Sequence, residues 1–131
     1  MRELIIPSRH AELERVLTFV EAYVADHELG DDMLDRLMLL GSEAATNAME
    51  HGNQYNEAKA VRLKLWKEGD RVVMTVQDEG DGFVPEDEAN NPLTPENLLE
   101  DHGRGLFLMR EMATALEYED DGRRVRMEFA V

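Results

Sequence analysis

The sequence has no cysteine, and it has only four prolines and one tryptophan among its 131 residues. Without cysteine the chain can form neither disulfides nor thiolate metal sites. No apolar run reaches the roughly 18 residues that a membrane-spanning helix needs, and the N-terminal residues lack the apolar stretch of a secretory signal. These absences predict a cytoplasmic protein that has no membrane partner.

Basic residues are also scarce, since 14 Lys and Arg stand against 29 Asp and Glu, which gives a formal charge of −15. A chain of this kind lacks the basic face of a nucleic-acid binder, so we expect no nucleic-acid partner. The charge repels anionic nucleotides at long range, so a nucleotide site would need a cation and a locally positive pocket. The same charge would steer a basic protein partner toward the surface, or it only keeps the protein soluble.

Apolar residues make up 43 % of the chain, which is enough for a hydrophobic core, and the length fits a single domain over residues 1–131. Hydrophobic periodicity predicts the order β-α-α-β-β-loop-α-β-β. The expected elements are strand Glu3–Pro7, helix Ala11–Glu28 with Ser8 as its cap, a helix from about Met33 to Gly52, strands Val61–Lys67 and Arg71–Asp78, a helix containing Leu106 to Leu116, and strands Leu116–Asp120 and Arg124–Val131.

Two hairpins with helices between them predict a two-layer α/β sandwich (α+β). We expect a mixed, mostly antiparallel sheet with three helices on one face. The stretch from Glu79 to His102 is acidic and lacks periodicity, and loops of that length are usually functional or disordered. The sequence has no P-loop, no Rossmann fingerprint, no zinc-ligand spacing and no nucleophile elbow.

The first candidate cluster lies on the second predicted helix. Glu43 and Asn47 are four residues apart, so both lie on one face, opposite the apolar positions. The amide oxygen of Asn47 is a hard ligand that suits Mg²⁺, a cation that keeps phosphates and waters among its ligands. The carboxylate of Glu43 could take a proton from an attacking hydroxyl or water. A solvated helix face would explain the same residues, although Asn costs roughly half a kcal/mol in a helix relative to Ala.

The second candidate cluster is Asp78, Gly80 and Gly82, directly after a predicted strand. A carboxylate at a strand end can accept a hydrogen bond from an exocyclic amine such as that of adenine. The two glycines would let the backbone approach a flat ring. An ordinary turn rich in Asp and Gly is the alternative interpretation.

The third candidate cluster is Gly103, Arg104 and Gly105, at the start of a predicted helix. Backbone N–H groups at a helix N-terminus attract phosphate, and Arg104 would supply the local positive charge that the acidic chain otherwise lacks. A plain helix start explains these residues equally well when they are considered alone.

The three clusters follow one another in a fixed order between residues 43 and 105. This order resembles the N, G1 and G2 boxes of the GHKL (Bergerat-fold) ATPase superfamily. Two stretches are similar to anti-sigma factor serine kinases of the RsbW/SpoIIAB type, namely Ser42–Gly52 and Gly103–Met109. Histidine kinases generally lack the His-Gly pair that ends the first stretch. The resemblance spans nearly the whole chain.

The resemblance implies a Bergerat ATP-binding fold and a kinase that uses Mg²⁺ and ATP. Glu43 would be the general base toward a protein serine, and Asn47 would hold Mg²⁺. Asp78 would read adenine, while Gly80 and Gly82 would line the base.

The resemblance further implies that Gly103, Arg104 and Gly105 meet the phosphates and that residues 84–102 form the ATP lid. Relatives of this type phosphorylate a serine on a STAS-domain antagonist (an anti-anti-sigma protein), and many alternately hold a sigma factor. They commonly form homodimers.

Two other functions stay open on the sequence. One is an ATP-dependent sequestering module that phosphorylates nothing, although the presence of both Glu43 and Asn47 argues against it. The other is a partner-switch regulator of a target that is not a sigma factor, such as a phosphatase or cyclase pathway.

Overall fold

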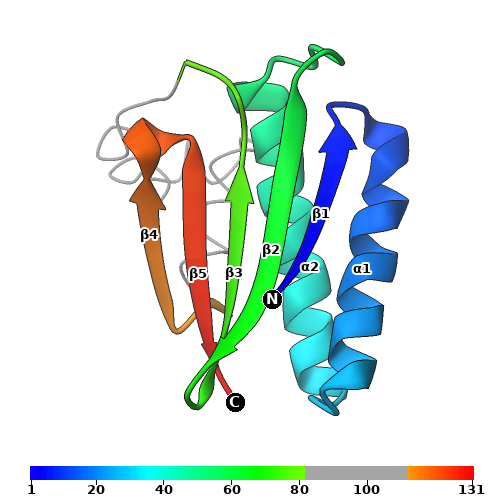
Figure 1. The fold of residues 1–131 in the computed structure, drawn as a ribbon, viewed down its shortest axis with the longest axis vertical. Coiled ribbons are helices and arrows are strands. Elements are labelled where there is room, and N and C mark those ends of the chain that lie inside the picture. Colours follow the sequence, from blue (N-terminus) through cyan, green and yellow to red (C-terminus); the bar gives the residue numbers. More distant parts are fainter. Residues whose placement is uncertain (82–111) are drawn as a thin grey trace, which may run out of the picture.

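A computed structural model describes residues 1–81 and 112–131, which form one sheet and two helices (Figure 1). The strands are β1 Arg2–Pro7, β2 Ala60–Glu68, β3 Arg71–Gln77, β4 Ala115–Glu119 and β5 Arg124–Ala130. The helices are α1 Leu13–Asp26 and α2 Asp31–Asn47, with short helical turns η1 His10–Glu12, η2 Ala48–Gly52 and η3 Asp120–Gly122. Each predicted strand agrees with an observed strand to within one residue at either end.

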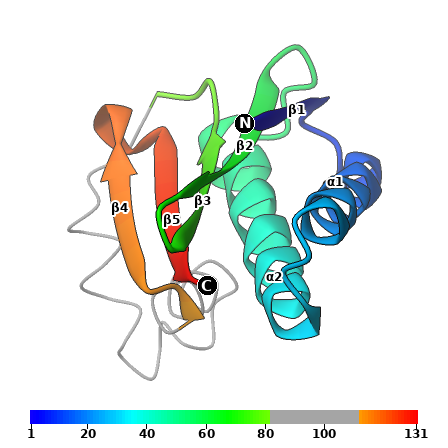
Figure 2. The same cartoon turned by 60° about the horizontal axis from the view of Figure 1, so that its bottom comes forward.

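The sheet has the order β1-β2-β3-β5-β4, and each neighbouring pair is antiparallel. The predicted mostly antiparallel α/β sandwich is therefore confirmed, although the described strands include no parallel pair. Neighbouring strands are antiparallel because β2–β3 and β4–β5 are hairpins, and because the two helices between β1 and β2 bring the chain back in the opposite direction. Both helices cover the same face of the sheet (Figure 2).

The helix count differs from the prediction of three, since the described residues contain two long helices. Leu106 and most of the third predicted helix lie outside the described residues. Its predicted end is wrong, because Leu116 belongs to strand β4 and only Met112 of the described residues before that strand is helical. The alternation of a strand determines the structure there, because Leu116 and Tyr118 pack against the core, while Glu117 lies opposite Arg126 on the other face of the sheet.

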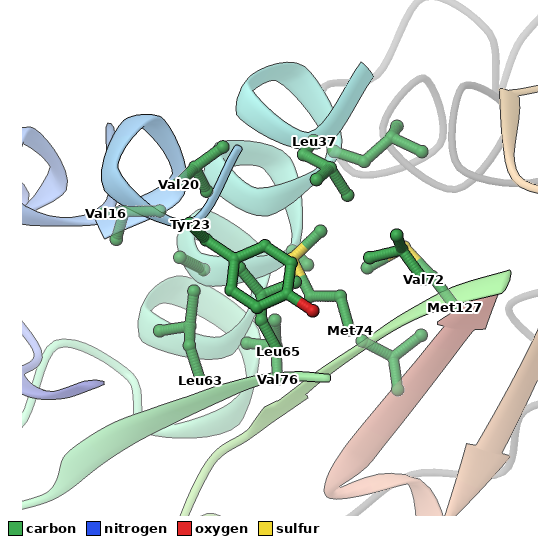
Figure 3. Packing of buried hydrophobic residues seen from close by; sticks show 14 of the residues in the cluster. Val16, Val20, Tyr23, Leu37, Leu63, Leu65, Val72, Met74, Val76 and Met127 are labelled. Atoms are coloured by element: carbon green, nitrogen blue, oxygen red, sulfur yellow. The ribbon is translucent and has the colours of Figure 1, made fainter. Parts of the chain in front are cut away.

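The core lies between the helices and the sheet. Alternate residues of β2, β3 and β5 point toward α1 and α2, and they are at most 7 % exposed: Val61, Leu63, Leu65, Val72, Met74, Val76, Val125, Met127 and Phe129. Val16, Val20 and Tyr23 of α1 and Leu37 of α2 pack against them (Figure 3). Each such side chain contributes about 1.5–3 kcal/mol when fully buried, so this layer holds the helices on the sheet.

Ser8 does not cap the first helix, contrary to the prediction. Arg9 occupies the cap position of η1, and α1 begins only at Leu13. The Ser8 hydroxyl instead donates to the carbonyl oxygen of Lys59 at 2.9 Å. A long-range polar contact therefore replaces the local cap. Within residues 1–81 and 112–131, no helix has both the length and the apolarity that crossing a bilayer requires.

Candidate functional site

The helix that carries Glu43 and Asn47 ends in an unusual way. Both side chains are half-buried on α2, and Asn47 is the last α-helical residue. The next five residues, Ala48–Gly52, form a π-helix rather than the α-helix that was predicted. The Asn53 N–H accordingly donates to the carbonyl of Ala48, five residues back, at 2.8 Å. Single π turns of this kind occur frequently at functional sites.

This widened turn brings the end of the helix against the turn after β3. Asp78 follows β3 directly and is only 8 % exposed. A Cβ atom on Gly52 would lie 2.3 Å from the Asp78 carboxyl group, and a Cβ atom on Gly80 would lie 2.0 Å from the carbonyl oxygen of Gly52. Real Cβ atoms essentially never approach other atoms so closely. Gly80 therefore requires glycine because its obstacle is backbone, and a side chain at Gly52 would displace the Asp78 carboxyl group.

The carboxyl group of Asp78 is held in a defined orientation. Its Oδ1 accepts a hydrogen bond from the Gly80 N–H at 2.8 Å, and the Asp78 N–H donates to the carbonyl of Arg123 at 2.8 Å. Burial raises the pKa of Asp78 above its ordinary value of 3.8, the Gly80 N–H and the charges of Arg123 and Lys59 oppose this rise, and Asp120 adds to it. A buried, oriented acceptor of this kind suits an amine donor on a ligand.

Asn53 is a residue of the site that the sequence did not indicate. Its side chain is buried, at 2 % exposure, and both sides of the amide are used. The Nδ2 group donates to the Ser8 hydroxyl at 2.8 Å and to the Ala60 carbonyl at 3.0 Å, and Oδ1 accepts from the Glu79 N–H at 2.7 Å. Asn53 thus joins the end of the helix to the turn after β3. In the sequence, Asn after Gly52 indicated only a helix end.

The remaining predicted site residues, Gly82, Gly103, Arg104 and Gly105, lie outside the described residues, as does the predicted lid at residues 84–102. The structure therefore brings the end of the helix that carries the first cluster to the second cluster, through the contact of Gly52 with Asp78.

Among the described residues, Asn47 is the predicted ligand for a metal ion. No group of three His, Cys, Asp or Glu side chains that could hold a metal occurs among residues 1–81 and 112–131. Asn47 offers one amide oxygen on α2. Mg²⁺ usually takes only one or two protein ligands and completes its shell with phosphate and water oxygens.

Comparisons with known proteins identify the family. Residues 6–129 match the family described as histidine kinase-like ATPase domain. An anti-sigma F factor of Clostridium perfringens is 32 % identical over 113 residues, covering 83 % of this chain and 81 % of the relative. Anti-sigma F factors of Bacillus thuringiensis and Bacillus cereus are each 33 % identical over 99 residues, covering 75 % of this chain and 68 % of the relative. In this chain a buried carboxylate after β3 lies against a glycine at the helix end. On the family match and the relatives, the chain belongs to the histidine kinase-like ATPase domain family and is a relative of the anti-sigma F factors.

Proposed function

We propose that this protein is an ATP-dependent serine kinase that acts as an anti-sigma regulator in a partner-switching pathway. The observation that carries the proposal is the contact between the end of the helix and the buried Asp78 turn, where Gly52 and Gly80 meet. It supports a nucleotide site because the carboxylate is oriented beside the helix that bears Glu43 and Asn47. The likeness to anti-sigma F factors supports the regulatory part.

In this proposal the residues of α2 act on the phosphate end of the nucleotide. Asn47 contributes an oxygen ligand to Mg²⁺, which when bound neutralises phosphate charge that the acidic chain would otherwise repel. Glu43, one turn earlier, accepts the proton of the attacking serine hydroxyl. The buried Asp78 carboxylate accepts a hydrogen bond from the adenine amine, and the Gly80 and Gly82 backbone lines the base.

The other parts of the proposal follow the family. Gly103, Arg104 and Gly105 bind the phosphates under a lid formed by residues 84–102. The partners are a STAS-domain anti-anti-sigma protein, which receives the phosphoryl group, and a sigma factor, and the kinase works as a homodimer. The formal charge of −15 would speed association with a basic surface on either partner. Both ATP and sigma factors are cytoplasmic, so the proposal also places the protein there.

The nucleotide site is tested by calorimetric titration of ATP with magnesium present. Asp78→Asn should weaken ATP binding by about 1.5–3 kcal/mol, roughly ten- to a hundred-fold, because one charge-assisted hydrogen bond is lost. Glu79→Gln is a suitable control, since Glu79 is exposed and its own side chain bonds the Ala60 N–H. Equal ATP affinity in wild type and Asp78→Asn would rule out the adenine role.

The kinase activity is tested with labelled ATP and candidate STAS-domain proteins. Glu43→Gln should leave ATP affinity largely unchanged while phosphoryl transfer falls by about two or more orders of magnitude, because the base is lost and the shape is kept. An unchanged transfer rate would remove Glu43 from the mechanism. ATP binding by the wild type without transfer to any STAS protein would favour the sequestering module, and capture of a partner other than sigma would redirect the regulatory assignment.

A further inference from the structure

The side chain of Arg123, in the hairpin formed by β4 and β5, reaches the Asp78 turn. It follows η3, where Asp120 and Asp121 adopt φ values of 52° and 55° and Gly122 of 86°, so the backbone turns sharply just before it. The Arg123 Nε donates to the carbonyl oxygen of Gly80 at 2.7 Å, and Nη2 donates to that of Asp81 at 3.2 Å. A residue 43 positions away in the sequence therefore satisfies the two carbonyl groups at the end of the described turn.

The guanidinium of Arg123 is fixed from its own side as well. Its Nη1 donates to the Asp120 carbonyl at 3.3 Å and lies 3.8 Å from the Asp120 carboxylate and 3.5 Å from that of Asp121. The side chain is 30 % exposed, so most of it packs against protein. Because the guanidinium donors form a rigid planar fork, contacts on both sides restrict the position of the Gly80 and Asp81 carbonyls.

The turn is thus held from two directions. Asn53 bonds the Glu79 N–H from the end of the helix, and Arg123 bonds the carbonyls of the next two residues from the final hairpin. The backbone of Arg123 also accepts from the Asp78 N–H. Loss of the Arg123 side chain would free the Gly80 and Asp81 peptides to reorient toward water while leaving the sheet pairing in place.

We propose that Arg123 is a positioning residue of the nucleotide site, which sets the geometry of the Asp78–Asp81 turn and thereby the preference for adenine over guanine. The inference rests on the proposed function, because it assumes that Asp78 accepts from the exocyclic amine of adenine. Guanine presents a carbonyl oxygen at that position, which a well-placed carboxylate repels. A loosened turn would lose affinity for ATP but would change that for GTP little.

The test compares Arg123→Met with Arg124→Met. Arg124 is the matched control, since the two variants lose the same charge, and the Arg124 guanidinium bonds Glu119 at 2.9 Å and Gln77 at 3.5 Å instead of the turn. ATP and GTP are titrated separately by calorimetry with magnesium, and thermal unfolding checks that each variant is folded. We expect R123M to reduce the ATP-over-GTP preference about ten-fold, and R124M to change it less than two-fold.

Three results would overturn the inference: an unchanged preference in R123M, an equal loss in R124M, or a parallel loss of ATP and GTP affinity in R123M. If R123M does not fold, Arg123→Lys replaces it, because Lys keeps the charge but has one donor nitrogen in place of the planar fork, and about a three-fold loss of preference is expected. Failure of this inference is distinguishable from failure of the proposed function. If the wild type binds ATP and Asp78→Asn weakens that binding, the adenine site is supported even when Arg123→Met has no effect.

Discussion

The molecule uses glycine for different reasons where η2 meets the Asp78 turn and in the core under the middle of the sheet. At Gly80 a Cβ atom would collide with the backbone carbonyl of Gly52, which cannot move without shifting the helix end. At Gly41, buried in the middle of α2, the nearest atom to a Cβ would be the Met74 sulfur at 3.4 Å, which belongs to a flexible side chain. A backbone contact therefore requires glycine at position 80, whereas alanine fits at position 41.

Polar groups show the same contrast. Asn53 is buried at the site end, and its amide bonds three different segments of the chain. Tyr23 is buried in the core at 1 % exposure, and among the described residues its hydroxyl has no hydrogen-bond partner. Its ring stacks on His27, with centroids 4.1 Å apart. The structure around Asn53 and the Asp78 turn is therefore stabilised by hydrogen bonds of defined direction, whereas the core is stabilised by close packing of side-chain volume.

The largest expected effect is at Gly80. Gly80→Ala should lower the free energy of unfolding by about 3 kcal/mol, because an inserted methyl group forces two backbone segments apart. Gly41→Ala should be neutral or slightly stabilising, since Ala is the better helix former by about 1 kcal/mol. Urea unfolding followed by the fluorescence of Trp66, the single tryptophan, measures both. Similar destabilisation by the two variants would contradict the conclusion that only Gly80 is required by its contacts.

The next effect concerns Asn53. Asn53→Ala should cost about 2 kcal/mol of stability, because the buried Ser8 hydroxyl and the part-buried backbone groups of Glu79 and Ala60 lose their partner. Asn56→Ala is the control, since the Asn56 side chain accepts from the Ala58 N–H at an exposed position. We expect that control to cost less than about 0.5 kcal/mol. Equal losses in the two variants would mean that the amide of Asn53 does not hold the turn.

A smaller effect of opposite sign is expected in the core. Tyr23→Phe should raise the free energy of unfolding by about 1 kcal/mol, because it removes a buried hydroxyl and keeps the ring. Tyr55→Phe serves as the contrast, since the Tyr55 hydroxyl bonds His10 Nε2 at 2.8 Å on the surface and its loss should be neutral or slightly destabilising. A destabilised Tyr23→Phe variant would show that the core also depends on directional contacts.

The smallest effect is the pH dependence that Asp78 introduces. Because burial raises the pKa of Asp78 in the folded state, the folded protein holds this proton more tightly than the unfolded chain. Its contribution to stability is therefore greatest below 3.8 and is lost as the pH rises through the folded-state pKa. The stability of Asp78→Asn relative to wild type should increase from pH 4 to pH 7 in urea titrations. A constant or falling difference would contradict the assigned direction.

Much of the fold followed from local pattern. The apolar patterns predicted all five strands to within one residue at either end, and both predicted hairpins are observed. The end of the third predicted helix failed because Leu116 fits helical spacing and strand alternation equally well, and pairing with Met127 decides for the strand. Ser8 failed as a cap because its hydroxyl has a distant partner, the carbonyl of Lys59.

By itself, the sequence determined the order of the five strands and of α1 and α2, and the presence of Glu43, Asn47, Asp78 and Gly80 at a helix and a strand end, since these depend on neighbours a few residues apart. Only the tertiary structure decided that Gly52 touches Asp78, that Asn53 bonds Glu79 across 26 residues, and that Arg123 bonds Gly80 across 43. The physical reason is that each of these contacts joins a side chain to a backbone group of a distant element, and that backbone partner has no residue type that a sequence pattern could reveal.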